Sequence, residues 1–237
     1  MKKMLVSDYD GTFYTDEDNI KLNIEEVERF RKLNNLFIIA TGRSYYDFGK
    51  KKKKYNIKYD YLVINHGATI LSRDEKTISN YAIDENIKSE LIEQLDLNDQ
   101  DNMFACSGLE SRVSIYSKNI TKINKKYKTL EEAKKNNDYI NKKYKNKLEC
   151  YLLPNSNAIE IISAKTNKAK AISELSKLED IEQNAVYTIG DSYNDIEMIE
   201  KFNGYSMENA KEEVKIVSKG ECTSVSKFIK NILMSEQ

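Results

Sequence analysis

Two aspartates near the N-terminus have the spacing of a reactive pair. Asp8 and Asp10 follow the apolar run 4–7 and precede Gly11. Side chains two positions apart on a strand project to the same side, so we expect the two carboxylates to lie together. Neighbouring carboxylates repel each other unless a cation neutralises them, which a divalent metal ion does. A surface turn built on the Asp-Gly pair is the structural alternative.

A second acidic group follows another apolar run, at 186–189. Asp191 comes after this run, and Asn194 and Asp195 stand where a helix is predicted to begin. Helix capping accounts for Asn194 or Asp195 but not for Asp191, which precedes the helix. Oxygen ligands from two strand ends suit Mg²⁺, which prefers few carboxylates together with water and substrate phosphate.

Two further segments carry groups that bind phosphate. Thr41 and Gly42 follow the apolar run 36–40, and a hydroxyl with free backbone N–H groups at such a junction binds phosphate oxygens. Helix capping by Thr41 is the alternative. Arg43 either reaches a substrate or pairs with an acid. Lys168 begins a predicted helix, but one lysine among so many indicates by itself only a solvated helix face.

The elements that carry these groups alternate between short apolar runs and amphipathic segments. Strands are predicted at 4–7, 36–40, 61–64, 185–189 and 214–217. Helices are predicted at 24–34, 44–55, 168–178, 195–201 and 225–233. This alternation indicates an α/β fold, a parallel sheet with helices on both faces.

The middle of the chain has a different rhythm. Strands are predicted at 103–107, 112–116, 149–153 and 158–162, and helices at 85–95 and 130–144. Grouped strands with two helices indicate an α+β domain inserted into the α/β chain. We therefore predict a core of residues 1–80 and 158–237, with a cap of residues 81–157.

Composition excludes some classes of partner. The 38 basic and 38 acidic residues cancel, so no global field attracts nucleic acid or an anionic membrane. The lysine-rich stretch 118–147 is interrupted by acids and asparagines, which indicates a solvated surface of the cap. No stretch approaches the roughly 20 apolar residues that span a bilayer. We expect neither a nucleic-acid nor a membrane partner.

Cysteine usage and the N-terminus indicate a cytoplasmic protein. Cys106, Cys150 and Cys222 are odd in number and far apart, which disfavours a disulfide framework or a zinc site. The N-terminus lacks the apolar stretch of about 7–15 residues that a signal peptide needs. The sequence leaves a monomer and a homodimer equally open.

Together these segments resemble the motifs of the haloacid dehalogenase (HAD) superfamily. Residues 8–12 resemble the first motif, Thr41 the second, Lys168 the third and residues 190–195 the fourth. The match at Lys168 has Ala169 in place of the usual glycine. The position of the insertion, together with residues 65–68 and 207–210, resembles the Cof-type branch, whose cap is of type IIB (C2B).

The resemblance implies roles in catalysis and metal binding. Asp8 corresponds to a nucleophile that forms an aspartyl-phosphate. Asp10 corresponds to the acid that protonates the leaving oxygen and then deprotonates the attacking water. Mg²⁺ would be held by Asp8, Asp191 and the backbone carbonyl of Asp10, with Asp195 supporting these ligands.

Phosphate-binding roles follow in the same way for Thr41, Gly42, Lys168 and Asn194, with Arg43 as a possible contact to substrate. Fixed donors and cations of this kind stabilise the charge of a transferring phosphoryl group. His66 is the one histidine of the chain, and we expect it to be packed and hydrogen-bonded rather than catalytic.

The predicted function is Mg²⁺-dependent hydrolysis of small phosphate monoesters, with sugar phosphates favoured among small phosphorylated metabolites. One alternative is a phosphomutase, which would use the same residues and return the phosphoryl group to its product. Another is a non-enzymatic phospho-acceptor that binds magnesium and regulates a partner. A stable phospho-Asp8 would favour that last reading, whereas an acid at position 10 disfavours it.

Overall fold

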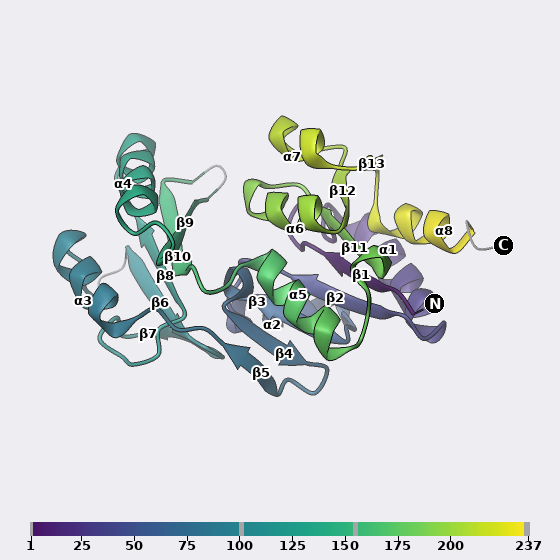
Figure 1. Cartoon of the computed structure of the whole chain (residues 1–237), viewed down its shortest axis with the longest axis horizontal. Coiled ribbons are helices and arrows are strands. Elements are labelled where there is room, and N and C mark those ends of the chain that lie inside the picture. Colours follow the sequence, from purple (N-terminus) through teal and green to yellow (C-terminus); the bar gives the residue numbers. More distant parts are fainter. Residues whose placement is uncertain (1, 100–101, 154–155, 235–237) are drawn as a thin grey trace.

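The computed structural model of the chain describes residues 2–99, 102–153 and 156–234, and within them it contains two β-sheets, each with its own helices (Figure 1). The larger sheet has, in spatial order, strands β13 (Glu221–Cys222), β12 (Asn203–Met207), β11 (Val186–Gly190), β1 (Met4–Ser7), β2 (Leu36–Ala40), β3 (Tyr61–Ile64), β4 (Thr69–Ser72) and β5 (Thr77–Asn80). Strands β13 to β3 are parallel, and β4 and β5 continue the sheet antiparallel.

Strand order determines where a ligand can bind. The chain runs from β1 outward to β2 and β3, and β11, on the other side of β1, continues outward to β12. In open parallel sheets, ligands bind beyond the carboxyl ends of the strands where the order reverses. That place is the end of β1 and β11, which are followed by Asp8 and Asp191.

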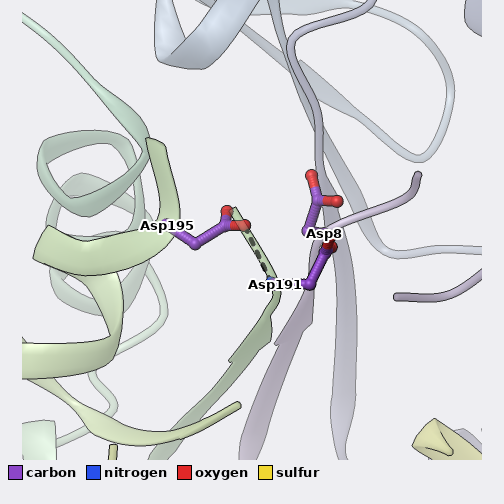
Figure 2. A group of neighbouring side chains, drawn as sticks. All are labelled: Asp8, Asp191 and Asp195. Carbon is purple, nitrogen blue, oxygen red and sulfur yellow. Dashed lines mark hydrogen bonds between the residues drawn. The ribbon is translucent and has the colours of Figure 1, made fainter. Parts of the chain in front are cut away.

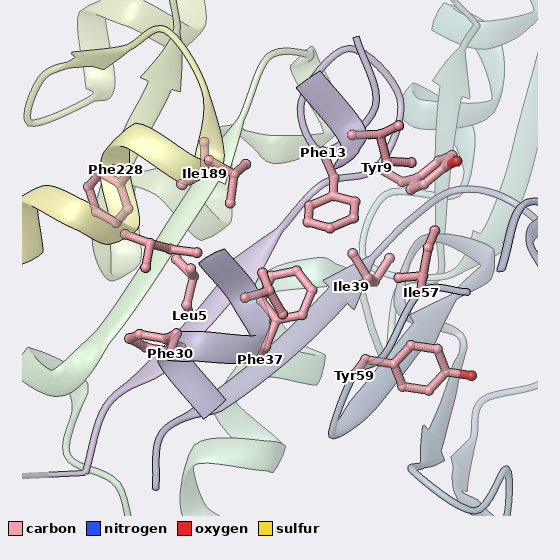
Figure 3. Packing of buried hydrophobic residues seen from close by; sticks show 14 of the residues in the cluster. Leu5, Tyr9, Phe13, Phe30, Phe37, Ile39, Ile57, Tyr59, Ile189 and Phe228 are labelled. Carbon is pink, nitrogen blue, oxygen red and sulfur yellow. The ribbon is translucent and has the colours of Figure 1, made fainter. Parts of the chain in front are cut away.

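Helices cover both faces of the larger sheet. On one face lie α1 (Glu17–Lys32), α2 (Tyr45–Tyr55) and α8 (Val225–Met234); on the other lie α5 (Lys168–Leu178), α6 (Ile196–Lys201) and α7 (Glu212–Val217). Helix α1 shows why such a segment forms a helix on the sheet. Ile20, Val27 and Phe30 form one buried stripe, and Asp16 caps the first turn. Figure 3 shows the packing on the face covered by α1, α2 and α8, where side chains of β1 and β2, such as Leu5 and Phe37, lie among aromatic side chains of the helices, such as Phe30 and Phe228.

The smaller sheet is built from the middle of the chain. Its strands are β7 (Glu110–Val113), β6 (Met103–Ser107), β8 (Lys122–Lys126), β10 (Ala158–Ser163) and β9 (Leu148–Leu152), all antiparallel, and its helices are α3 (Glu85–Gln94) and α4 (Leu130–Lys143). Side chains alternate along each strand. Ile123, Ile159 and Ile161 pack beneath the two helices, whereas Lys122 and Glu160 face the core.

Three short 3₁₀ helices complete the described elements: η1 (Asn65–Gly67), η2 (Gln183–Ala185) and η3 (Tyr193–Asp195). The predicted fold class, an α/β parallel-sheet core with an inserted α+β domain, is confirmed. Across the described ranges, none of the helices combines the length and the apolar character needed to cross a membrane.

Two predictions require correction. The strand predicted at 214–217 is instead the end of α7, in which Val214 is buried among the helices of one face. The predicted solvated surface at 118–147 includes β8, whose Lys122 and Lys125 are buried. Ile123 is the one apolar residue of this strand, so the sequence pattern did not separate the strand from the charged segment around it.

The predicted domain boundary at residue 158 falls at the start of β10. This strand is hydrogen-bonded to β8 and β9 of the smaller sheet, so it does not extend the larger one. We therefore propose a core of residues 1–80 and 164–237, with a cap of residues 81–163. Residues 81–84 and 164–167 connect the two.

Candidate active site

A cavity of about 820 Å³ lies between the core and the cap. Its floor contains residues that follow the core strands, including Asp8, Thr41 and Asp191, and cap residues such as Phe104 and Tyr151 line its upper part. Because all of the core strands involved are parallel, their carboxyl ends bring these side chains to the same edge of the sheet.

Asp8 lies just beyond β1, at the floor of this cavity. Its backbone N–H donates to the carbonyl of Ile189, which continues the pairing of β1 with β11 by one residue. The chain then turns, because the N–H of Phe13 donates to the carbonyl of Asp8. Asp8 and Asp10 therefore stand on a turn rather than on the strand itself, yet both line the cavity.

Lys168 stands between two carboxylates. Its Nζ lies 2.5 Å from Oδ1 of Asp8 and 2.7 Å from Oδ1 of Asp195, and its side chain is fully buried. Lys165 and Lys170, the neighbouring candidates, are exposed. Position 168 is the first residue of α5, where Asn167 caps the helix. The structure thus brings the predicted lysine to Asp8, although 160 residues separate them.

Asp191 and Asp195 complete an acidic group with Asp8 (Figure 2). Carboxylate oxygens of these three residues lie within 4.8 Å of one another. Thr12 donates to Oδ1 of Asp191 at 2.7 Å, which fixes that carboxylate. Gly11 permits the approach, since it has φ +82° and a Cβ there would lie 2.5 Å from Asp191 Oδ2.

Asp195 supports the loop that carries Asp191. Its Oδ2 accepts hydrogen bonds from the backbone N–H groups of Asp191 (3.1 Å) and Ser192 (3.0 Å), while Oδ1 accepts from Lys168. Both oxygens of this fully buried carboxylate are therefore already engaged. The arrangement fits the supporting role proposed for Asp195.

The electrostatics of the group favour a further cation. Burial raises the pKa of Asp8 well above its usual range; Lys168 opposes this shift, and the charges of Asp195 and Asp191 add to it. Burial likewise raises the pKa of Asp191. Burial acts to lower the pKa of Lys168, but Asp195 and Asp8 outweigh it and raise the pKa. One ammonium group does not neutralise three carboxylates, so this set of oxygen donors fits Mg²⁺.

Thr41 lies at the corresponding position after β2. Its backbone N–H donates to the carbonyl of Val63, and the residue is 1% exposed. Its Oγ1 accepts the backbone N–H of Arg43 at 3.1 Å. Gly42, between them, also lines the cavity. Both predicted phosphate-binding residues of this loop are therefore at the floor.

Arg43 is paired with an acid, which is one of the two alternatives that the sequence leaves open. Its Nε and one terminal nitrogen each lie 2.7 Å from an oxygen of Asp10. The guanidinium also lies over the ring of Tyr9, 5.8 Å from the ring centroid. Asp10 remains half exposed at the cavity, so the pair holds its carboxylate at the entrance.

Asn194 contacts His66 rather than another acid. Its Nδ2 lies 3.1 Å from Nδ1 of His66, and His66 Nε2 lies 2.5 Å from Oε2 of Glu160. Tyr151 stacks on the imidazole, with ring centroids 4.6 Å apart. Burial lowers the pKa of His66. The histidine is thus buried and hydrogen-bonded, as expected.

Two residues of this neighbourhood were not predicted. Lys122 donates to Oε1 of Glu160 at 2.7 Å and to the carbonyl of Gly42 at 2.6 Å. Burial acts to raise the pKa of Glu160, but the charge of Lys122 and the bond from His66 lower it to about 2. Glu160, a single charged residue between Ile159 and Ile161, was the available signal, since a charged residue between buried neighbours needs a partner.

The sequence matches a family model described as haloacid dehalogenase-like hydrolase, over residues 5–149 and 109–227. An uncharacterized protein of Mycoplasma capricolum is 28% identical, over 85% of this chain and 88% of that protein. The "Putative phosphatase YxeH" of Bacillus subtilis is 23% identical, over 90% of both chains.

Solved structures share the fold. A "putative HAD/COF-like hydrolase" from Plasmodium vivax superimposes with a TM-score of 0.83 at 20% identity, covering 99% of this chain and 96% of that one. Because nearly the whole of both chains is covered, the similarity includes the cap as well as the core.

Proposed function

Because the chain belongs to the haloacid dehalogenase-like hydrolase family, we propose that it is a Mg²⁺-dependent phosphatase that hydrolyses small phosphate monoesters through a phosphorylated Asp8. The resemblance to the HAD superfamily and its Cof-type branch is confirmed. The observation that carries the proposal is the position of Lys168, whose buried ammonium contacts Asp8 at the floor of a covered cavity.

In the first half of the proposed reaction, Asp8 attacks phosphorus. A bond forms between a carboxylate oxygen and phosphorus while the bond from phosphorus to the ester oxygen breaks, and Asp10 gives that oxygen its proton. Lys168, the Thr41 hydroxyl and the N–H groups near Gly42 hold the phosphoryl oxygens, whose charge is spread in the transition state.

In the second half of the proposed reaction, water displaces Asp8 from phosphorus. Asp10, now ionised, removes a proton from the water that attacks phosphorus, and the bond to Asp8 breaks to release inorganic phosphate. Residues that would hold Mg²⁺ are Asp8 and Asp191 with the backbone carbonyl of Asp10. The ion supplies charge neutralisation and orientation of the phosphate.

The ion pair of Asp10 with Arg43 matches the ionised form of Asp10, which the second half of the reaction uses. For the first half Asp10 must take up a proton, so one of its oxygens has to release Arg43. A bidentate arginine restricts a carboxylate more than a lysine would, so Arg43 holds Asp10 at the cavity entrance. We propose that Arg43 positions Asp10, in place of the direct contact with substrate that was the other alternative. Asn194 remains a candidate phosphate ligand through its second Nδ2 hydrogen.

The lining of the cavity favours a hydroxylated leaving group. Among the residues that the structure describes, Oδ1 of Asn137 and Oδ1 of Asn194 are buried and have no hydrogen-bond partner, and both residues line the cavity. Unpaired buried acceptors favour a ligand that brings donors, and hydroxyl groups do so. The adjacent side chains of Phe104 and Tyr151 offer an apolar wall. We therefore favour sugar phosphates among the candidate substrates.

Phosphate release from p-nitrophenyl phosphate tests the proposal. We expect release with Mg²⁺ but not with EDTA, and we expect Asp8→Asn to abolish it. Asp18→Asn is the matched control, because that side chain is 93% exposed on α1. Release that survives Asp8→Asn would contradict the nucleophile. Isomerisation of a sugar phosphate without phosphate release would identify a mutase instead.

A further inference from the structure

A lysine of the cap reaches into the loop that follows β2 of the core. Lys122, on β8, places Nζ 2.6 Å from the carbonyl oxygen of Gly42 and 2.7 Å from Oε1 of Glu160. Its side chain is 2% exposed. A buried ammonium is costly unless its partners are well placed, so this position is strongly specified by the groups around it.

The carbonyl that Lys122 contacts belongs to the same peptide unit as the N–H of Arg43. That N–H donates to Oγ1 of Thr41 at 3.1 Å. A trans peptide is planar, with its C=O and N–H directed to opposite sides. Lys122 therefore holds one end of the unit and Thr41 the other. Donation to a carbonyl also polarises its N–H, which strengthens the second bond.

The hydrogen bond from the Arg43 N–H determines which part of the Thr41 hydroxyl is available to a ligand. Within the part of the chain that the structure describes, Thr41 Oγ1 accepts this one bond and donates none. A hydroxyl has one donor hydrogen. With its oxygen held by the Arg43 N–H, the hydrogen of Thr41 is available to a phosphate oxygen at the floor of the cavity.

We propose that Lys122 is a positioning residue for phosphate, acting through the Gly42–Arg43 peptide on the Thr41 hydroxyl. The phosphate site would then be complete only while the cap is docked on the core. This inference rests on the proposed phosphatase function, since it assumes that Thr41 binds the phosphoryl group.

The surrounding contacts couple docking of the cap to the position of the core loop at Gly42. Glu160 accepts hydrogen bonds from Lys122 and Asn124 of its own sheet and from His66 of the core. The His66 ring in turn packs on Gly42, where a Cβ would lie 2.4 Å from it. Separation of the cap would break the contacts to His66 and Gly42 but leave Lys122 with Glu160.

A direct contact between Lys122 and the leaving group is the competing explanation, because Lys122 also lines the cavity. Inorganic phosphate distinguishes the two, since it has no leaving group. If Lys122 contacts only the leaving group, its replacement changes the KM for esters and leaves the affinity for inorganic phosphate unaltered. If Lys122 positions Thr41, its replacement raises the KM for esters and also lowers the affinity for inorganic phosphate.

The experiment is isothermal titration of inorganic phosphate, with Mg²⁺ present, into the full-length wild type and into Lys122→Met. Lys125→Met is the matched control: Lys125 is a buried lysine of the same strand, and its Nζ bonds Asn102. Loss of a hydrogen bond from a charged donor predicts a Kd raised about tenfold in Lys122→Met. We expect Lys125→Met to bind as the wild type does.

An unchanged Kd in a folded Lys122→Met would overturn the inference, whether or not KM for esters changes. If Lys122→Met does not fold, Lys122→Met combined with Glu160→Gln removes both buried charges, and we expect the same tenfold loss. Wild-type protein that binds no phosphate at all would instead refute the proposed function. As a second readout, KM for two esters with different alcohols should rise by the same factor.

Discussion

The imidazole of His66 occupies the space that a side chain on Gly42 would need. A Cβ at position 42 would lie 2.4 Å from Cε1 and 2.6 Å from Nε2 of the ring. The ring cannot easily withdraw, because Glu160 and Asn194 bond its two nitrogens and Tyr151 stacks on it. Packing against His66 therefore requires glycine at position 42, independently of any role of Gly42 in binding phosphate.

We accordingly expect Gly42→Ala to lower the free energy of unfolding by about 1–3 kcal/mol, the usual cost of overpacking. Gly49→Ala is the matched control, since it lies in α2 with no atom within 4 Å of the new Cβ. That change should raise the free energy of unfolding by about 0.5–1 kcal/mol through helix propensity. Urea unfolding of both variants measures the contrast. Equal effects would show that the His66 ring yields freely.

The acidic group of Asp8, Asp191 and Asp195 predicts opposite effects of one substitution with and without metal. Asp191→Asn removes a carboxylate whose ionised form burial disfavours, so the metal-free variant should melt at a higher temperature than metal-free wild type. Mg²⁺ at 100 times its Kd should stabilise wild type by about 2.7 kcal/mol. It should stabilise the variant much less.

Thermal melts in EDTA and in Mg²⁺ measure both effects, and neither readout depends on turnover. Asp18→Asn serves again as the control, with a wild-type response to Mg²⁺ expected. An equal rise in Tm for wild type and Asp191→Asn would contradict the assignment of Asp191 as a metal ligand.

Stability should fall on acidification because of His66. Burial lowers its pKa below the ordinary value of 6.5; the bond and charge of Glu160 oppose this shift, while Lys122 and Lys168 add to it. In the unfolded chain the histidine takes a proton near pH 6.5, but in the folded chain only at lower pH. The neutral folded form therefore contributes stability above pH 6.5, and this contribution is lost as the pH falls below it.

The measurement compares urea unfolding of wild type and His66→Gln at pH 7.5, 6.5 and 5.5. The advantage of wild type should shrink by up to about 1.4 kcal/mol per pH unit below 6.5. Glu160 titrates in a separate window, because its pKa of about 2 in the fold lies below the ordinary 4.5, so its contribution is lost between those values. A difference that stays constant from pH 7.5 to 5.5 would refute the role of His66.

Much of the floor of the site is predictable because strand ends determine it. Asp8, Thr41 and Asp191 each follow an apolar run, and parallel strands end at one edge. Lys168 required the resemblance to a family, since nothing local separates it from Lys165. In the structure Lys168 is buried against Asp8, whereas Lys165 is exposed.

The contacts between core and cap were not predictable in the same way. Lys122 lies in a lysine-rich stretch whose composition resembles a solvated surface, and its burial depends on Glu160, which is 38 residues away in the chain. The error at 214–217, which include Val214, concerned the type of element. A run of four apolar and charged residues fits a short strand or a single helical turn equally well. Only packing against one face of the larger sheet decided for the helix.

The two crossings between the domains limit which molecules the site can accept. Residues 81–84 and 164–167 are four-residue tethers, and four residues reach at most about 14 Å when fully extended. Because both are short, the cap is able to pivot but not to slide away. The connectors therefore set an upper limit on the separation of cap and core, and we expect a size limit on the alcohol portion of the ester. We therefore expect connector length, as well as the residues that line the cavity, to influence which esters the protein accepts.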